Sequence, residues 1–391
     1  MILNVSVWRK MMMKTKIVEF IGRIQDGGAE TLVKDYALLL DKEKFDVTVL
    51  CEDYRPDSNI YKILKENGVK IVCMYEKSFF FNKVAARILG KRYVAMLTKK
   101  ALRKLKPDLI HAHLELLEVL YYCRNDLDDI RLLWTCHNPP QKLIGDERPA
   151  ERDACRYLLD HNDLQIIALH EDMAKEIEEM YGIHNVAVIR NAVDFDRFSH
   201  LKKNRKEMRE ELGISEDAYV IGQVGRFDEQ KNPKFTLSVF HELCKKYDNC
   251  CLLMIGRGNL ENELREKIKE LDLEVKARIL VNRDDVPELM NAMDVFVLPS
   301  RFEGFGIVLI EAQIVGLPCV VSDNVPKAVY QSKNITCLSL KDPIDRWVEA
   351  LREPTGNIDR YGDIDEYDMK REIKNLEKLY MNSLQQWQKQ S

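Results

Sequence analysis

Two glutamates flank a glycine-rich turn, and their types and spacing predict a ligand site. Glu303 and Glu311 lie eight residues apart. The turn Gly304-Phe305-Gly306, which follows Glu303, separates the apolar run 294–298 from the mostly apolar run 307–315 that contains Glu311. These runs predict a buried strand and a following helix, so the glycines lie at a helix N-terminus. Backbone N–H groups are unpaired there and carry the positive end of the helix dipole, which suits an anion such as a diphosphate. Glu311, about one turn into the helix, can accept two hydrogen bonds from a vicinal diol such as a ribose.

Two cations, Arg226 and Lys231, lie at the end of another predicted strand, 219–224. The pair Asn232-Pro233 follows them and is typical of a helix N-cap and first helical position. Cations at a strand end beside a helix start can hold a diphosphate and stabilise the charge that it gains as a leaving group. Taken alone, these residues would be interpreted as solvated loop cations. Together with the two glutamates, they predict a phosphate-binding site.

The segment 299–312 is one of five blocks that follow one another in a characteristic order. The other four are Gly27-Gly28-Ala29-Glu30, Arg190-Asn191-Ala192-Val193-Asp194, Gly225-Arg226-Phe227 with Gln230-Lys231-Asn232, and Asn282-Arg283-Asp284-Asp285-Val286-Pro287. Together they resemble the motifs of retaining glycosyltransferases of family 4, including the Glu-x7-Glu motif and the diphosphate loop of that family. The matches run from about Lys16 to Val325, and ordered blocks are far more specific than a single motif. Ala192 and Val281 stand where this family commonly has glycine.

The resemblance implies an α/β fold of the GT-B type, in which two doubly wound Rossmann-like domains face a central cleft. We expect residues 14–196, with a returning C-terminal helix at 370–389, to form the acceptor-side domain. Residues 197–369 would form the domain that binds the nucleotide-sugar donor. Strand-like runs that alternate with helical patterns agree with parallel sheets covered by helices. The predicted strands are 16–21, 47–51, 70–74, 108–111, 131–136, 165–169, 219–224, 251–255, 277–281, 294–298 and 318–321.

The resemblance also implies a role for each site residue. We expect catalytic roles for four side chains: Arg226, Lys231, Glu303 and His137. The cations would stabilise the departing diphosphate, Glu303 would accept hydrogen bonds from the donor sugar, and His137 would contact that sugar. The residues expected to bind the nucleotide sugar are Gly27, Gly28, Arg226, Lys231, Arg283, Glu303, Gly304, Phe305, Gly306, Ile307 and Glu311.

Two alternatives concern these same side chains. His137 ends the predicted strand 131–136, so it can also be a strand-end histidine satisfied by a neighbouring backbone group. Glu303 and Glu311 can be read as the acid and base of a hydrolase. We disfavour the hydrolase because Glu311 is helical and, by the resemblance, faces a ribose.

The implied activity is metal-independent and retaining transfer of a hexose or N-acetylhexosamine from a nucleotide-diphosphate sugar, for which UDP-sugar is the first choice. We expect a saccharide acceptor linked to a polyprenyl diphosphate, in the biosynthesis of a surface polysaccharide such as a capsule or exopolysaccharide. No cofactor beyond the donor substrate is expected.

Three other functions stay open at this point. One is a non-catalytic or weakly catalytic nucleotide-sugar-binding subunit that supports a partner glycosyltransferase. The others are a nucleotide-sugar epimerase of the same fold and a transferase acting on soluble sugars, as in sucrose-synthase relatives. A dinucleotide dehydrogenase is disfavoured because Gly22 to Gly28 lacks G-x-G-x-x-G spacing.

Patterns that could hold a metal are weak. His111 and His113 would share one face of a strand, but the sequence places no third ligand beside them, so we expect no metal there. Acidic D-x-D patterns lie in turns, loops or helix ends rather than after a buried strand: Asp126-Leu127-Asp128, Asp194-Phe195-Asp196 and Asp363-Ile364-Asp365. We therefore expect two cations and a helix N-terminus to take the place of a divalent ion.

The segment 83–106 is basic and amphipathic and contains no acidic residue. It predicts a helix that lies on an anionic membrane surface, where each nearby cation contributes about 1 kcal/mol. The triplet Phe79-Phe80-Phe81 strengthens this expectation because exposed aromatic side chains insert at membrane interfaces. The alternative is an ordinary surface helix whose apolar face lies in the core.

The composition agrees with these expectations. A chain of 391 residues with 46% hydrophobic content is long enough for two domains, and a net charge of −4 does not suggest nucleic-acid binding. Ten cysteines without C-x-x-C spacing predict reduced thiols, and no apolar run reaches the roughly 20 residues that span a bilayer. We do not interpret residues 1–14 as a signal peptide, and Met11, Met12 or Met13 is as good an initiator as Met1. We expect a cytoplasmic protein, peripheral on the inner face of the cell membrane.

Overall fold

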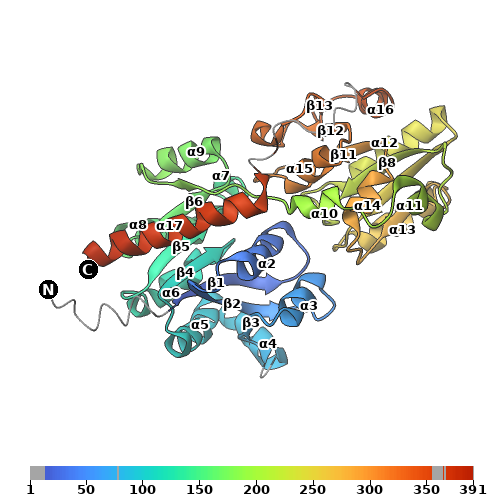
Figure 1. The fold of residues 1–391 in the computed structure, drawn as a ribbon. Helices are drawn as coiled ribbons and strands as arrows, with labels where there is room; N and C mark the ends of the chain where they lie inside the picture. Colours follow the sequence, from blue (N-terminus) through green and yellow to red (C-terminus); the bar gives the residue numbers. More distant parts are fainter. Residues whose placement is uncertain (1–13, 77–78, 355–363, 365–366, 391) are drawn as a thin grey trace. The chain divides into compact units, whose positions relative to one another are not determined.

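The computed structural model describes residues 14–76, 79–354, 364 and 367–390, which form two compact units. Unit 1 comprises residues 1–190 and 370–391, and unit 2 comprises residues 191–369. The boundary expected at 196/197 lies slightly C-terminal to the observed division. Each unit is a parallel sheet covered by helices (Figure 1), so the expected fold class, two Rossmann-like domains, is confirmed.

Unit 1 contains a sheet with the order β3-β2-β1-β4-β5-β6-β7. Its strands are β1 (Thr15–Ile24), β2 (Phe45–Tyr54), β3 (Lys70–Cys73), β4 (Leu109–His113), β5 (Arg131–Thr135), β6 (Gln165–Ala168) and β7 (Ala187–Val188). The helices are α2 (Gly28–Leu39), α3 (Asn59–Glu66), α4 (Phe79–Leu89), α5 (Lys91–Leu105), α6 (Leu117–Cys123), α7 (Pro140–Ile144), α8 (Pro149–His161), α9 (Glu171–Tyr181) and α17 (Met369–Gln390). The strand order reverses between β1 and β4, so this is the switch point of the sheet.

Unit 2 contains a sheet with the order β10-β9-β8-β11-β12-β13, and it reverses between β8 and β11. The strands are β8 (Tyr219–Val224), β9 (Cys250–Ile255), β10 (Ala277–Leu280), β11 (Val295–Leu298), β12 (Cys319–Ser322) and β13 (Ile335–Leu338). The helices are α10 (Phe195–Ser199), α11 (Arg205–Glu211), α12 (Pro233–Lys246), α13 (Glu261–Glu270), α14 (Val286–Asn291), α15 (Ile307–Ile314) and α16 (Ile344–Arg352). The central strands β9, β11 and β12 are buried along their whole length, as expected for a parallel sheet with helices on both faces.

The basic segment 83–106 is not one helix, and this expectation was wrong. Gly90 adopts a φ of 62° and divides the segment into α4 and α5. In α5 the residues Val94, Ala95, Thr98 and Leu102 are buried, whereas Asn82 is the buried member of α4. Among the described residues, no helix is both long and apolar enough to cross a bilayer.

The C-terminal helix α17 packs on unit 1 (Figure 1). The Tyr380 hydroxyl is fully buried and donates to Glu19 Oε1 at 2.7 Å. Glu377 accepts from the Asp41 N–H at 2.8 Å. Helix α17 therefore completes the core of the unit that β1 begins.

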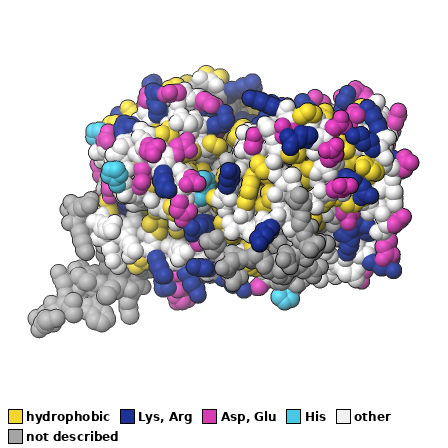
Figure 2. Space-filling view, turned by 90° about the horizontal axis from the view of Figure 1, so that it is seen from above, with side chains coloured by type: hydrophobic (Ala, Val, Ile, Leu, Met, Phe, Trp, Pro, Cys, Tyr) yellow, Lys and Arg dark blue, Asp and Glu magenta, His cyan; other side chains and the backbone are white. Residues whose placement is uncertain are grey.

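Charges of both signs are interspersed on the face of the molecule that Figure 2 shows. Neither Lys and Arg nor Asp and Glu gather there into a patch of one sign. The distribution on this face agrees with the small net charge of −4. It does not have the one-signed character of a nucleic-acid-binding surface.

In unit 2, the loops after β8 and β9 pack backbone against backbone. Gly256 has a φ of 148°, and a β-carbon on it would lie 1.9 Å from the Gly225 carbonyl oxygen. A β-carbon on Gly258 would lie 2.2 Å from the Phe227 carbonyl oxygen. The Phe227 N–H also donates to the Arg257 carbonyl at 3.0 Å. The glycines therefore allow the second loop to support the first.

Replacing Gly256 tests this contact between the loops. We expect Gly256→Ala to lower the free energy of unfolding of unit 2 by about 2–4 kcal/mol, because it combines backbone strain with a collision against a carbonyl. Gly213→Ala is the matched control: its φ is 58°, and the nearest atom to an added β-carbon is Arg278 Nη1 at 4.0 Å. It should lose only about 1 kcal/mol. Equal losses in urea unfolding would contradict the close loop packing.

Candidate functional site

The candidate site in unit 2 lies at the switch point of its sheet. The loop 225–232 follows β8, and the loop 299–306 follows β11. Because β8 and β11 are parallel neighbours, both loops leave the same edge of the sheet. At this edge their chains diverge to different crossover helices, which is where doubly wound sheets bind ligands.

An ion pair joins the two loops. Lys231 Nζ lies 2.6 Å from Glu303 Oε1, and the two side chains are only 14% and 5% exposed. The same carboxylate oxygen accepts from the Ser300 hydroxyl at 2.6 Å. Ser322 in turn donates to the Ser300 carbonyl at 2.6 Å. The sequence-predicted cation and carboxylate are therefore in direct contact and held by a further layer of hydrogen bonds.

Neutral hydrogen bonds fix the loops around this pair. The Arg301 N–H donates to the Gln230 carbonyl at 2.8 Å, and Asn232 Nδ2 donates to the Pro299 carbonyl at 3.1 Å. Gln223 Nε2, from within β8, donates to the Lys231 carbonyl at 2.8 Å. Asn232 is the N-cap of α12, as predicted, but its φ is 53° and its side chain makes no capping bond. The amide links the two loops instead.

The other residues of this predicted group surround the pair. The Arg226 side chain is 44% exposed, and its Nη2 donates to Gln230 Oε1 at 3.2 Å. Gly306 is the N-cap of α15 with a φ of 88°, and no side chain caps this helix start. Phe305 is buried, and its ring lies 5.7 Å from that of Tyr367. An exposed cation and an open helix N-terminus thus lie beside a buried ion pair.

Glu311 and Ile307 lie on α15, and both are partly exposed. Glu311 is in the second turn of this helix, as the sequence predicted. Arg283 pairs instead with Asp285 on its own loop and with Glu211 at 3.1 Å. Its guanidinium would have to share these carboxylates to contact a nucleotide.

In unit 1, Gly27 and Gly28 start α2 directly after β1. A β-carbon on Gly27 would lie 2.4 Å from Glu30 Oε2, so the Glu30 carboxylate lies over this position. At Gly28, among the described residues, no atom outside the adjoining backbone lies within 4 Å of the corresponding point. Gly28 therefore offers the open backbone, whereas Glu30 already covers Gly27.

A buried polar network occupies the switch point of unit 1. Glu19 on β1 pairs in register with His111 on β4. His113 Nε2 lies 2.8 Å from Glu19 Oε2, and His113 Nδ1 lies 2.9 Å from His137 Nε2. The alternative prediction was that a neighbouring backbone group satisfies His137. The partner of His137 Nε2 is instead the side chain of His113.

The second branch of this network leads to α17. His111 Nδ1 lies 2.6 Å from the Tyr380 hydroxyl, and His111 Nε2 lies 2.6 Å from Thr135 Oγ1. Tyr36 stacks on His111 with ring centroids 5.9 Å apart. Every ring nitrogen of His111 and His113 thus has a hydrogen-bond partner.

The network contains one buried carboxylate, that of Glu19. Burial would raise the pKa of Glu19, but His111 and His113 outweigh it and lower that pKa to about 2. Burial and the neighbouring His111 lower the pKa of His113 to about 4, although Glu19 opposes this. Burial and the other two histidines also lower the pKa of His137 well below its usual value. At neutral pH, Glu19 is therefore ionised, whereas His113 and His137 are neutral.

Glu19, His111 and His113 offer potential ligand atoms that lie within 4.8 Å of one another. The sequence had indicated no third ligand, and Glu19 shows that expectation to be wrong. The nitrogens are already satisfied by hydrogen bonds, and the donors on Tyr380 and His113 satisfy both oxygens of Glu19. The described side chains of this group therefore satisfy one another by hydrogen bonds.

The D-x-D patterns have other contacts in the described part of the chain. Asp126 pairs with Arg103 at 2.8 Å, and Asp194 caps α10 by accepting from the Asp196 N–H at 3.2 Å. Asp363 and Asp365 lie outside the described residues.

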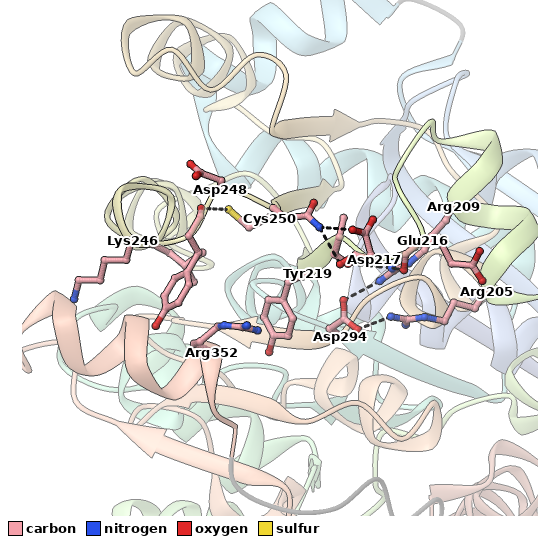
Figure 3. Close-up of a pocket in the computed structure, with 14 residues that line it drawn as sticks. Arg205, Arg209, Glu216, Asp217, Tyr219, Lys246, Asp248, Cys250, Asp294 and Arg352 are labelled. Carbon is pink, nitrogen blue, oxygen red and sulfur yellow. Dashed lines mark hydrogen bonds and ion pairs between the residues drawn. The ribbon is translucent and has the colours of Figure 1, made fainter.

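A separate pocket of about 460 Å³ lies at the opposite edge of the unit 2 sheet, where β8 and β9 begin (Figure 3). Three of its charged groups pair with one another: Arg209 Nη2 lies 2.8 Å from Asp294 Oδ2, and Arg205 contacts the same carboxylate. Arg352 lies over the rings of Tyr219 and Tyr247, at 4.9 and 5.1 Å. These contacts anchor α11 and the strand starts, and they make this pocket structural rather than a second anion site.

Sequence reasoning did not find Glu19 and Tyr380. Glu19 carries a signal, because it is a charged residue inside the apolar run 17–21. Tyr380 carries no such signal, since its partner Glu19 lies 361 residues away in the chain.

Comparison with known protein families finds a match in each half of the chain. The family model "Glycosyltransferase Family 4" matches residues 26–197, and "Glycosyl transferases group 1" matches residues 204–353. The second match includes Arg226, Lys231, Glu303 and Glu311.

Individual relatives of the chain are also named as glycosyltransferases. The chain is 35% identical to "Putative glycosyltransferase EpsF" of Bacillus subtilis over 167 residues, which span 42% of this chain and 44% of that protein. It is 28% identical to the "UDP-Gal:alpha-D-GlcNAc-diphosphoundecaprenol alpha-1,3-galactosyltransferase" of Escherichia coli over 327 residues, 80% of this chain and 81% of that one. The crystal structure of Anabaena Alr3699/HepE in complex with UDP and glucose shares the fold, with a TM-score of 0.72 at 17% identity, covering 94% of this chain and 100% of that chain. The chain therefore belongs to the family 4 glycosyltransferases, and its two units have the GT-B fold.

Proposed function

We propose that this glycosyltransferase moves a hexose or N-acetylhexosamine from a UDP-sugar to a lipid-linked saccharide, with retention of the anomeric configuration. The observation that carries the proposal is the Lys231–Glu303 contact of 2.6 Å at the switch point of unit 2. This contact places a cation that can bind a diphosphate next to a carboxylate that can accept hydrogen bonds from sugar hydroxyls. The helix start at Gly306 adds uncapped N–H groups beside them.

The chemistry follows from where charge develops. As the bond between the sugar C1 and the diphosphate oxygen breaks, negative charge grows on the diphosphate, and Arg226 and Lys231 stabilise it. The acceptor oxygen forms its bond to C1 on the face that the diphosphate leaves. The proton of the acceptor hydroxyl passes to the departing phosphate oxygen, so the scheme needs no nucleophile from the protein. Glu303 holds the Lys231 ammonium before the donor binds and then accepts hydrogen bonds from the sugar.

Each of the remaining predicted residues also has a role in this proposal. Glu311 accepts hydrogen bonds from the ribose diol, Gly28 admits the donor close to its backbone, and His137 contacts the donor sugar. The two cations replace a divalent ion, which makes transfer independent of metal. Arg283 would contribute only by sharing its carboxylate partners.

The choice of donor and acceptor is supported by the named relatives. A UDP-galactose transferase acting on an undecaprenol-linked saccharide and a structure holding UDP and glucose favour UDP-sugar and a polyprenyl-diphosphate acceptor. The alternatives, a binding subunit for a partner enzyme or a nucleotide-sugar epimerase, require donor binding without transfer to a saccharide.

A lipid-linked acceptor calls for contact with a membrane, and α4 is the surface suited to it. Phe80, Phe81 and Ile88 are 81%, 68% and 76% exposed. Figure 1 shows α4 at the periphery of unit 1, beside α5. Lys83 and Arg87 on α4 are exposed cations among these apolar side chains. We propose that α4 inserts its aromatic side chains at the anionic inner face of the cell membrane.

Donor binding can be measured by thermal stabilisation in EDTA with UDP, GDP, ADP and their sugar conjugates. We expect one UDP-sugar to stabilise the protein by about 2.7 kcal/mol when its concentration is 100 times Kd. Glu311→Ala should abolish this stabilisation, whereas Glu263→Ala, on the exposed side of α13, should retain it. Stabilisation that needs magnesium would contradict metal independence, and no stabilisation by any nucleotide would contradict the donor site.

Transfer itself depends on Lys231. We expect Lys231→Met to lower kcat by about 100-fold to 1000-fold, because charge on the leaving diphosphate loses its stabilisation. The matched control is Lys234→Met, which removes a lysine three residues away that pairs with Glu229 and Glu263 on the surface. Release of UDP from the UDP-sugar, measured with both variants, would contradict the proposal if they were equally active.

Membrane contact can be tested by sedimentation with vesicles of phosphatidylglycerol or of phosphatidylcholine. We expect binding to the anionic vesicles alone, and loss of most of it in the triple variant Phe80→Ser, Phe81→Ser, Ile88→Ser. Val275→Ser, which changes an 87% exposed apolar side chain in unit 2, should bind as the parent does. Unchanged binding of the triple variant, or of a variant with Lys99, Lys100, Arg103 and Lys104 neutralised, would argue against this surface.

A further inference from the structure

Two thiols of unit 2 are in contact with each other and take no part in the proposed transfer. Cys244 lies in the last turn of α12, and Cys250 is the first residue of β9. Their Sγ atoms lie 3.3 Å apart, and both side chains pack in the same apolar cluster. The short loop 247–249 joins the helix to the strand, so the backbone itself keeps the two sulfur atoms close.

The neighbouring Cys251 does not share this contact. Successive side chains of a strand point to opposite faces of the sheet, so Cys250 and Cys251 face different helices. The Cys251 thiol contacts the side chain of Arg278 on β10 instead. Cys251 is therefore a matched control for Cys250, with the same residue type and nearly the same burial.

The hydrogen bonds of Cys250 give the two thiols different roles. The Cys250 thiol donates to the Tyr247 carbonyl at 3.3 Å, so its one hydrogen is engaged there. In the contact between the sulfur atoms, the Cys244 thiol is then the donor. This hydrogen bond lowers the pKa of Cys250, and the charge of Lys276 acts in the same direction, although burial opposes them. The same contact raises the pKa of Cys244, so Cys250 is the thiol that ionises more readily.

The pair is open to a small oxidant. Cys250 lines the pocket of about 460 Å³ where β8 and β9 begin (Figure 3), and Cys244 is half-buried. Hydrogen peroxide is only slightly larger than water, so it can enter this pocket. Redox-sensitive cysteines combine access, a lowered pKa and a second thiol beside them. Cys250 has all three features.

We propose that Cys244 and Cys250 form a peroxide-sensitive thiol pair, which hydrogen peroxide converts into an intramolecular disulfide. The Cys250 thiolate attacks one peroxide oxygen: the S–O bond forms, the O–O bond breaks, and the leaving hydroxide takes up a proton to become water. The Cys244 sulfur then attacks the sulfenic acid on Cys250. The S–S bond forms, the S–O bond breaks, and the hydroxyl leaves with the Cys244 proton as a second water. The two thiols lose two electrons, which reduce the peroxide.

The geometry suits this reaction and separates it from sugar transfer. The sulfur atoms need to approach from 3.3 Å to a bond length of about 2 Å. Cys250 pairs in register with Tyr219 at the amino end of β8, whereas the candidate donor loops leave the carboxyl end. The thiol pair is thus a modification site independent of the proposed function.

The test is a peptide map of the full chain after treatment with hydrogen peroxide. The folded protein is oxidised, alkylated in denaturant without a reductant, and digested with trypsin. Cleavage after Lys245 and Lys246 places Cys244 and Cys250 in different peptides, 235–245 and 247–257. We expect these peptides to be joined, at a mass about 2 Da below their sum, and to separate in dithiothreitol. Unjoined peptides at a peroxide concentration that oxidises the exposed thiol of Cys337 would overturn the proposal.

Three variants identify the sulfur atoms that react. Cys251→Ser should retain the joined peptides, whereas Cys244→Ser and Cys250→Ser should lose them. Cys244→Ser should also accumulate a sulfenic acid on Cys250, which dimedone traps. Joined peptides in Cys250→Ser, or their loss in Cys251→Ser, would overturn the assignment of Cys250. A dimedone adduct on Cys244 in Cys250→Ser, with none on Cys250 in Cys244→Ser, would overturn the order of attack.

Discussion

The reversal of strand order in each parallel sheet is the constraint on which the rest of this structure depends. A crossover helix must cover one face or the other, so two neighbouring strands at the reversal send their chains apart. In unit 2 this opens the edge between β8 and β11, and the chain fills it with polar loops held together by the Lys231–Glu303 pair. In unit 1 the same edge, between β1 and β4, is filled by Glu19 and the histidines. In both units, buried ionisable side chains thus lie at the edge of the sheet where the strand order reverses.

The two edges handle charge differently. The ion pair of unit 2 is nearly neutral as a whole, and its lysine can be shared with an incoming anion without leaving a bare carboxylate, because Ser300 still donates to Glu303. The carboxylate of unit 1 has no lysine or arginine as its partner among the described residues. It accepts hydrogen bonds from Tyr380 and His113. A buried carboxylate orients its hydrogen-bond donors strictly, since any rotation leaves it unsatisfied at a cost of several kcal/mol.

Sequence reasoning could predict the sheets and the candidate loops of unit 2 because local patterns mark both. Apolar runs marked the central strands closely, and the candidate loops directly follow β8 and β11. It missed β7, which has two residues, and β13, whose residues are mostly half exposed, because neither has the pattern of a buried strand. Gly90 divided a segment whose amphipathic pattern continues across it, and a positive φ has no periodic signal. The Glu19 network joins residues from β1, β4 and α17, so no short stretch of sequence could contain it.

That long-range closure has a consequence for how the chain folds. Without α17, Glu19 would lose the hydroxyl of Tyr380, and His111 Nδ1 would lose its acceptor, each at a cost of about 1–3 kcal/mol. The same helix contributes the buried side chains of Leu376 and Tyr380 to unit 1. Unit 2, in contrast, contains the whole of its own sheet in the continuous segment 191–369. Unit 2 can therefore complete its core as soon as it is synthesised, whereas unit 1 completes its core and its Glu19 network only when α17 docks.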